Sequence, residues 1–252
     1  RHVVDRTAQN YLLAQLHDMA AGIWDAQART IAVPEGPTSM FLSQHFAVEA
    51  ILEKFGDDLH PGDIIITNDP FKGHCNHLPD WGFIRPVFYE DELVFVLLTR
   101  GHQLDTGGSF PGGYFANGYD IHAEGLMIPP IKIYDRGVER SDVLELIWNN
   151  VRFPEGVKID NYALMAGLTV GEKRIHSLLD KYGKQSVLNC VEEMLDRMEA
   201  NVRATITEIP DGTYFGESAT DDDGTTLDEQ VWVRCEATIA GDEMTLDFTE
   251  SD

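Results

Sequence analysis

Two short polar stretches of the sequence hold side chains that could bind a metal ion. In chain order, the candidate side chains are His74, Cys75, His77, Asp80, His102 and Asp105. Imidazole and carboxylate suit a divalent ion such as Mn, Zn or Fe, and two His with one Asp would leave coordination positions open for water or substrate. Such an ion acts as a Lewis acid or lowers the pKa of its bound water. The predicted metal ligands are therefore His77, Asp80 and His102.

Three apolar runs must position these ligands. Residues 64–67 form a β-branched run that ends at the first polar stretch. Residues 84–88 and 93–98 form two further runs, and the Glu90-Asp91 turn between them predicts a β-hairpin. Because antiparallel strands lie only about 5 Å apart, this hairpin can bring His102 close to the first stretch.

A purely structural interpretation of the same residues stays open at this point. A pair of His residues in a loop is commonly a surface or hydrogen-bonded feature, so their spacing alone does not establish a metal site. Cys75 has no Cys-x-x-Cys partner, and Cys190 and Cys235 lie far away in the sequence. The pattern favours Cys75 as an ordinary small residue rather than a ligand or nucleophile.

The candidate catalytic residues lie in and just before a long glycine-rich segment at 109–125. Loops of this length in a compact domain are usually functional, although a plain surface excursion is the alternative. His122 and Glu124 are the possible acid/base groups of this segment. Asp105, together with Asp120, is available to orient the imidazole rings of the metal ligands.

A series of short motifs then carries a family resemblance. The motifs are Gly62-Asp63, Thr67-Asn68-Asp69-Pro70, His77-Leu78-Pro79-Asp80, Pro86-Val87-Phe88, His102 with Asp105 and Gly107-Gly108, Pro111-Gly112, Glu124-Gly125, and Ile128-Pro129-Pro130 with Lys132. This order resembles the hydantoinase B/oxoprolinase family, densely over residues 62–137 and more loosely to the end of the chain. The family includes B-type chains of ATP-dependent hydantoinases and 5-oxoprolinases, and is related to the large subunits of acetone and acetophenone carboxylases.

The resemblance implies a metal-dependent function. In the acetone carboxylase branch a Mn ion is held by a His, an Asp three residues on and a later His, a pattern that falls on His77, Asp80 and His102. Two departures affect the surroundings of this site. Phe71 replaces the usual Tyr, and the segment 73–76 makes the approach to His77 one residue longer. A His that many relatives carry near residues 34–40 has no counterpart.

The implied activity is an ATP-dependent amidohydrolase that opens a small cyclic amide such as a hydantoin or 5-oxoproline. No phosphate-binding loop or dinucleotide fingerprint is present in the sequence. The resemblance explains this, because a hydantoinase A-type partner subunit or domain uses the ATP, which implies a hetero-oligomer. An ATP-dependent ketone carboxylase is the close alternative, and a non-catalytic scaffold subunit is the alternative from another class.

The composition of the chain argues against a nucleic-acid-binding protein and against a membrane-spanning one. The formal net charge of −24 would repel phosphate backbones, which argues against a nucleic-acid partner. No apolar run approaches the length of a membrane span, and three widely spaced cysteines without a secretory segment favour the cytoplasm. The first residue is not Met, and relatives are longer, so we expect a piece of a larger subunit.

The expected fold is α+β, with a mixed, mostly antiparallel sheet around the metal site. We expect an N-terminal α+β part at 1–140, a helical segment at 141–210 and a β-rich segment at 211–252. Apolar residues at helical spacing also predict a helix over 5–28.

Overall fold

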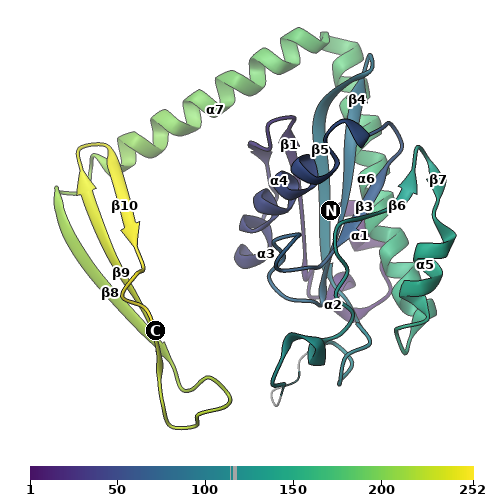
Figure 1. Cartoon of the computed structure of the whole chain (residues 1–252). Coiled ribbons are helices and arrows are strands. Elements are labelled where there is room, and N and C mark those ends of the chain that lie inside the picture. The colour runs from purple at the N-terminus through teal and green to yellow at the C-terminus, as the bar shows by residue number, and fades with distance from the viewer. Residues whose placement is uncertain (114, 116–117) are drawn as a thin grey trace. The chain divides into compact units, whose positions relative to one another are not determined.

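The computed structural model describes residues 1–113, 115 and 118–252 (Figure 1). Within them the chain forms two compact units, Arg1–Gly183 and Lys184–Asp252, and the first unit carries every candidate site residue. No helix in the described part of the chain is long and apolar enough to cross a membrane.

A seven-stranded sheet forms the centre of the first unit, with the strand order β2-β1-β5-β4-β3-β6-β7. Its strands are β1 (Met19–Asp25), β2 (Thr30–Ala32), β3 (Ile64–Thr67), β4 (Asp80–Tyr89), β5 (Glu92–His102), β6 (Ile131–Asp135) and β7 (Val138–Glu139). Every neighbouring pair is antiparallel. The predicted α+β class with an antiparallel sheet is confirmed.

The long hairpin β4–β5 forms where the apolar runs predicted it. Glu90 and Asp91 both have positive φ angles, of 50° and 63°, which is the backbone of the two-residue turns that match strand twist. At the other end of the hairpin, Asp80 pairs directly with His102. The hairpin therefore brings two of the predicted ligands face to face.

Helices cover the two faces of the sheet (Figure 1). Alternate residues of β5 point to opposite faces. The helix α4 (Gln44–Phe55) covers one face. On the other face, α6 (Pro154–Tyr182) packs against β5. The Thr99 hydroxyl donates to the Leu164 carbonyl of this helix at 3.3 Å. His102 is an even-numbered residue of β5, so its side chain points to the α4 side.

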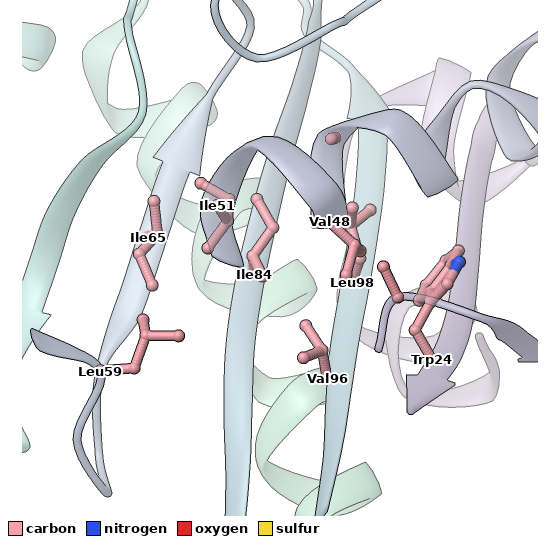
Figure 2. Close-up of a cluster of buried hydrophobic side chains, with 10 residues drawn as sticks. Trp24, Val48, Ile51, Leu59, Ile65, Ile84, Val96 and Leu98 are labelled. Atoms are coloured by element: carbon pink, nitrogen blue, oxygen red, sulfur yellow. The ribbon is translucent and has the colours of Figure 1, made fainter. Parts of the chain in front are cut away.

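Buried apolar side chains fill the space between α4 and the sheet (Figure 2). This cluster consists of Trp24, Ala28, Ala47, Val48, Ile51, Leu59, Ile65, Ile84, Val96 and Leu98. It fixes the strands whose ends carry the candidate ligands.

Replacing Leu98 by Ala is expected to lower the free energy of unfolding by about 2–5 kcal/mol, because Leu98 is fully buried and the change leaves a cavity. The same change at Leu146, which is 64% exposed on a helix, should alter stability by less than about 0.5 kcal/mol. Urea unfolding of both variants measures the difference. Equal losses would mean that the cluster does not carry the stability of the sheet.

The helix expected over 5–28 is wrong. Two short helices, α1 (His2–Thr7) and α2 (Tyr11–Ala14), are followed by β1, which pairs with β5 along its whole length. His17 has a φ of 54°, which interrupts any helix just before the strand. The pairing of β1 with a distant strand overrides the local helical spacing of the apolar residues.

Shorter elements complete the first unit. They are α3 (Thr38–Leu42), the 3₁₀ turns η1 (Gly56–Asp58) and η2 (Ile121–Glu124), and α5 (Ser141–Trp148). In the structure, β6 begins after Pro130 and lies between β3 and β7, so Pro129 and Pro130 precede a strand in the interior of the sheet.

The second unit consists of one helix and a small sheet. The helix α7 (Lys184–Ile206) is followed by β8 (Gly212–Thr220), β9 (Val231–Ala240) and β10 (Glu243–Asp247) in the order β10-β9-β8. These strands make the C-terminal part β-rich, as expected.

Candidate metal centre

The three predicted ligands lie together at one end of the β4–β5 hairpin. His77 Nε2 lies 3.0 Å from Asp80 Oδ1, and His102 Nδ1 lies 3.2 Å from the same oxygen. One ligand atom from each of the three residues falls within 4.8 Å of the others. This spacing fits a single divalent ion bound by two imidazoles and one carboxylate.

Burial of the site is uneven. Asp80 and His102 are almost fully buried, whereas the His77 side chain is 29% exposed. The two buried ligands come from paired strands and are fixed by the sheet, while His77 comes from the preceding loop. A ligand entering the site would therefore meet the His77 side.

The orientation of the His102 ring is set by its outer nitrogen. His102 Nε2 lies 3.0 Å from the Gly112 carbonyl oxygen, which can only accept, so this nitrogen carries a proton. The other nitrogen, Nδ1, then faces Asp80. Ligating His residues commonly donate their second N–H to a carbonyl in this way, so the donor set and its orientation both fit a bound cation.

The charges of the site stabilise one another. Burial opposes ionisation of Asp80, but hydrogen bonds from His102 and His77 outweigh it and lower the pKa of the carboxyl. Burial likewise disfavours the charged form of His102, yet its partners, Asp80 first among them, raise the pKa of the ring. The position between these groups thus favours positive charge.

Asp18 is a residue of this site that the sequence reasoning missed. Its Oδ2 lies 3.9 Å from His102 Nδ1, and its backbone carbonyl accepts from His102 N at 3.1 Å. Burial raises the pKa of Asp18, His102 opposes this, and Asp80 adds to it. A second carboxylate therefore borders the same nitrogen. Asp18 gains this position only because β1 pairs with β5, and no local sequence signal reports that pairing.

Replacing Asp18 by Asn is expected to weaken the affinity of the full-length protein for Mn²⁺ roughly tenfold, because the change removes one of two carboxylates beside His102 at nearly constant volume. Calorimetric titration measures the affinity. The matched control is Asp120→Asn, since Asp120 is exposed and its side chain accepts from His122 N in η2. An unchanged affinity in Asp18→Asn would remove Asp18 from the site.

Comparison with known proteins identifies the family of this chain. The family model described as hydantoinase B/oxoprolinase matches residues 1–252. The chain belongs to the hydantoinase B/oxoprolinase family. It is 33% identical over 95% of its length to the beta chain of the caprolactamase of Pseudomonas jessenii, and 29% identical over 98% to the B chain of a putative D-/L-hydantoinase of a Pseudomonas species (strain NS671).

The fold agrees with a solved structure of this family. The crystal structure of the ATP-dependent caprolactamase from Pseudomonas jessenii matches 97% of the chain with a TM-score of 0.88 and 32% identity. The chain covers 42% of that protein chain, and 41% and 43% of the two relatives. It thus spans less than half the length of the family members that it matches.

Among the residues that the structure describes, Asp105 bonds to Arg152 and Gly107 rather than to His77, Asp80 or His102. Its side chain is fully buried, forms an ion pair of 2.9 Å with Arg152, and accepts from Gly107 N at 3.1 Å. Arg152 N also donates to the second oxygen of Asp105, and the Arg152 guanidinium donates to the Gly108 carbonyl. Asp105 thereby anchors the turn that follows β5. Its expected role in catalysis stays a prediction.

The other two expected acid/base groups occupy different places. Glu124 Oε2 accepts from Leu78 N at 3.3 Å, so Glu124 holds the segment between His77 and Asp80 from outside. His122 is exposed in η2. Asp120, which was expected to orient an imidazole of the site, instead accepts from the backbone of His122. Catalytic roles for Glu124 and His122 also stay predictions.

Proposed function

We propose that the chain carries the metal centre of the B-type subunit of an ATP-dependent amidohydrolase that opens a small cyclic amide. The observation that carries this proposal is the convergence of His77, Asp80 and His102 on one point. Membership of the family supports it, as do the names of two relatives, a caprolactamase and a putative hydantoinase, because caprolactam and hydantoin are both cyclic amides.

In this proposal the three residues hold a Mn, Zn or Fe ion, which would polarise a carbonyl oxygen of the reacting amide. The buried pair, Asp80 and His102, fixes the position of the ion. Asp18 adds negative charge beside His102, and the Gly112 carbonyl keeps His102 Nδ1 directed at the ion. Substrate would approach from the exposed side of His77.

We assign the use of ATP to a hydantoinase A-type partner subunit or domain, which makes the active enzyme a hetero-oligomer. The name of a relative, caprolactamase subunit beta, supports the existence of a partner subunit. We also place the complex in the cytoplasm, in keeping with the free thiols of Cys75, Cys190 and Cys235.

Turnover by the purified complex of full-length subunits tests the proposal. The complex is supplied with ATP and either caprolactam, hydantoin, 5-oxoproline, or acetone or acetophenone with bicarbonate. ATP-dependent opening of a cyclic amide, lost in His102→Ala, is the expected result. Turnover of ketones alone would replace the amidohydrolase by a carboxylase. Full activity of His77→Ala and His102→Ala would instead make this chain a non-catalytic scaffold.

A further inference from the structure

A second contact lies directly beside the metal centre and joins the same loop to the same strand. Cys75 precedes His77 by two residues in the loop, and Arg100 precedes His102 by two residues in β5. The Arg100 Nη2 group donates to Cys75 Sγ at 3.3 Å. Because alternate residues of a strand share a face, the loop meets β5 twice in succession, first at Arg100 and then at His102.

Arg100 is unusual in its surroundings. Its side chain is fully buried, and its Nη1 donates to the Ser43 hydroxyl at 2.7 Å. Its Nε has no hydrogen-bond partner among the residues that the structure describes. Among the described residues Arg100 forms no ion pair. The groups that accept hydrogen bonds from its guanidinium, the Ser43 hydroxyl and the Cys75 thiol, are neutral. A buried cation depends strongly on each such contact, and hydrogen bonds from a charged donor are the stronger kind.

Cys75 is placed to accept this hydrogen bond. Only 6% of the residue is exposed, and its Sγ lies 3.7 Å from the carbonyl oxygens of Thr67 and Gly73, toward which the thiol proton can point. Just before Cys75, His74 has a φ of 47°, a backbone conformation that costs energy for a residue with a side chain.

We propose that the contact between Arg100 and Cys75 locks the loop from Asp69 to His77 onto β5, and that Arg100 is thereby a positioning residue for His77. This inference rests on the proposed metal centre. The sheet fixes Asp80 and His102 directly, whereas His77 depends on the loop. Opening of the loop would remove His77 from the site and leave the Arg100 guanidinium without its sulfur partner.

The first test measures how often the loop opens, and its readout does not depend on a metal ion. The full-length protein is treated with a small thiol-alkylating reagent, and modification of the Cys75 peptide is followed over time by mass spectrometry. The exposed Cys190 serves as the internal reference for reagent reactivity. Ser43→Ala and Arg100→Lys should each increase the alkylation rate of Cys75 by roughly tenfold, with no change at Cys190. An unchanged alkylation rate of Cys75 in both variants would show that the contact between Arg100 and Cys75 does not hold the loop on β5.

Ser43→Ala guards against a folding artefact, since it removes only one hydroxyl, which accepts from Arg100 and donates to the Met40 carbonyl, and leaves the Arg100 side chain intact. Far-ultraviolet circular dichroism checks that each variant is folded.

The second test asks whether the lock positions His77, with Mn²⁺ affinity as the readout. Cys75→Ala should weaken Mn²⁺ binding by roughly tenfold, whereas Cys75→Ser should retain most of it, because a hydroxyl can still accept from Arg100. Cys190→Ala is the matched control and should leave the affinity unchanged. Equal affinities in wild type and Cys75→Ala would overturn the positioning role. Failure of the wild type itself to bind Mn²⁺, Zn²⁺ or Fe²⁺ would refute the proposed metal centre, an outcome distinct from unchanged alkylation.

Discussion

Near-complete loss of bound metal is the expected result when His77, Asp80 or His102 is replaced by Ala in the full-length protein. Each change removes one of the three side chains that supply converging ligand atoms in the described part of the chain. Elemental analysis of the purified proteins measures the effect, and wild type should contain Mn, Zn or Fe at close to one ion per chain. The loss should be most complete for His102, because its ring faces both Asp80 and Asp18.

A fourth variant, His122→Ala, is the control for this experiment. His122 is exposed in η2 and lies outside the group of converging ligands, so the variant should keep its metal. Added metal should also stabilise wild type against unfolding, by about 2.7 kcal/mol at a free concentration one hundred times the dissociation constant. Metal retained in all three ligand variants would show that these residues are structural in this protein.

A pair of adjacent glycines offers the second large effect. Gly112 and Gly113 have φ angles of 81° and 71°, so an Ala at either position meets similar backbone strain. Their surroundings differ. A Cβ at Gly112 would meet nothing within 4 Å, whereas a Cβ at Gly113 would lie 2.1 Å from Pro79 Cγ. Only an Ala at Gly113 would push the loop away from Pro79, the residue that precedes Asp80.

Gly113→Ala is therefore expected to weaken Mn²⁺ binding by roughly 10- to 100-fold, because a displaced loop withdraws the Gly112 carbonyl from His102 Nε2. Gly112→Ala should stay close to wild type in affinity and carry only the shared cost of strain in its stability. Calorimetric titration of both variants separates the two effects. Equal affinities would show that this carbonyl does not orient the His102 ring.

The convergence of the three predicted ligands could be anticipated because the signals that position two of them are largely local. The apolar runs and the Glu90-Asp91 turn specify a hairpin, and one extra residue in the second strand, Val94, completes the register that pairs Asp80 with His102. A family resemblance then singled out the same residues. This part of the site needs no information from distant segments of the chain beyond the loop that holds His77.

The groups around the ligands could not be predicted, since they arrive by tertiary contacts. Asp18 reaches His102 through the pairing of β1 with β5, in a segment whose apolar spacing indicated a helix. Asp105 has the residue type expected of a catalytic group, but Arg152, which follows α5, binds it. The side chain of Arg100 gave no sign in the sequence that it would be buried against Cys75.

The hairpin also limits how this protein can change in length. From Asp80 to Val87 its two strands pair without interruption, so one inserted residue there would turn a ligand to the α6 side. The single unpaired position, Val94, opposes the step from Val87 to Phe88 near the turn, and this extra residue sets the register in which Asp80 faces His102. Insertions and deletions should therefore be tolerated at the tip of the hairpin, and a probe or affinity tag placed beside Glu90 and Asp91 should leave the metal centre untouched.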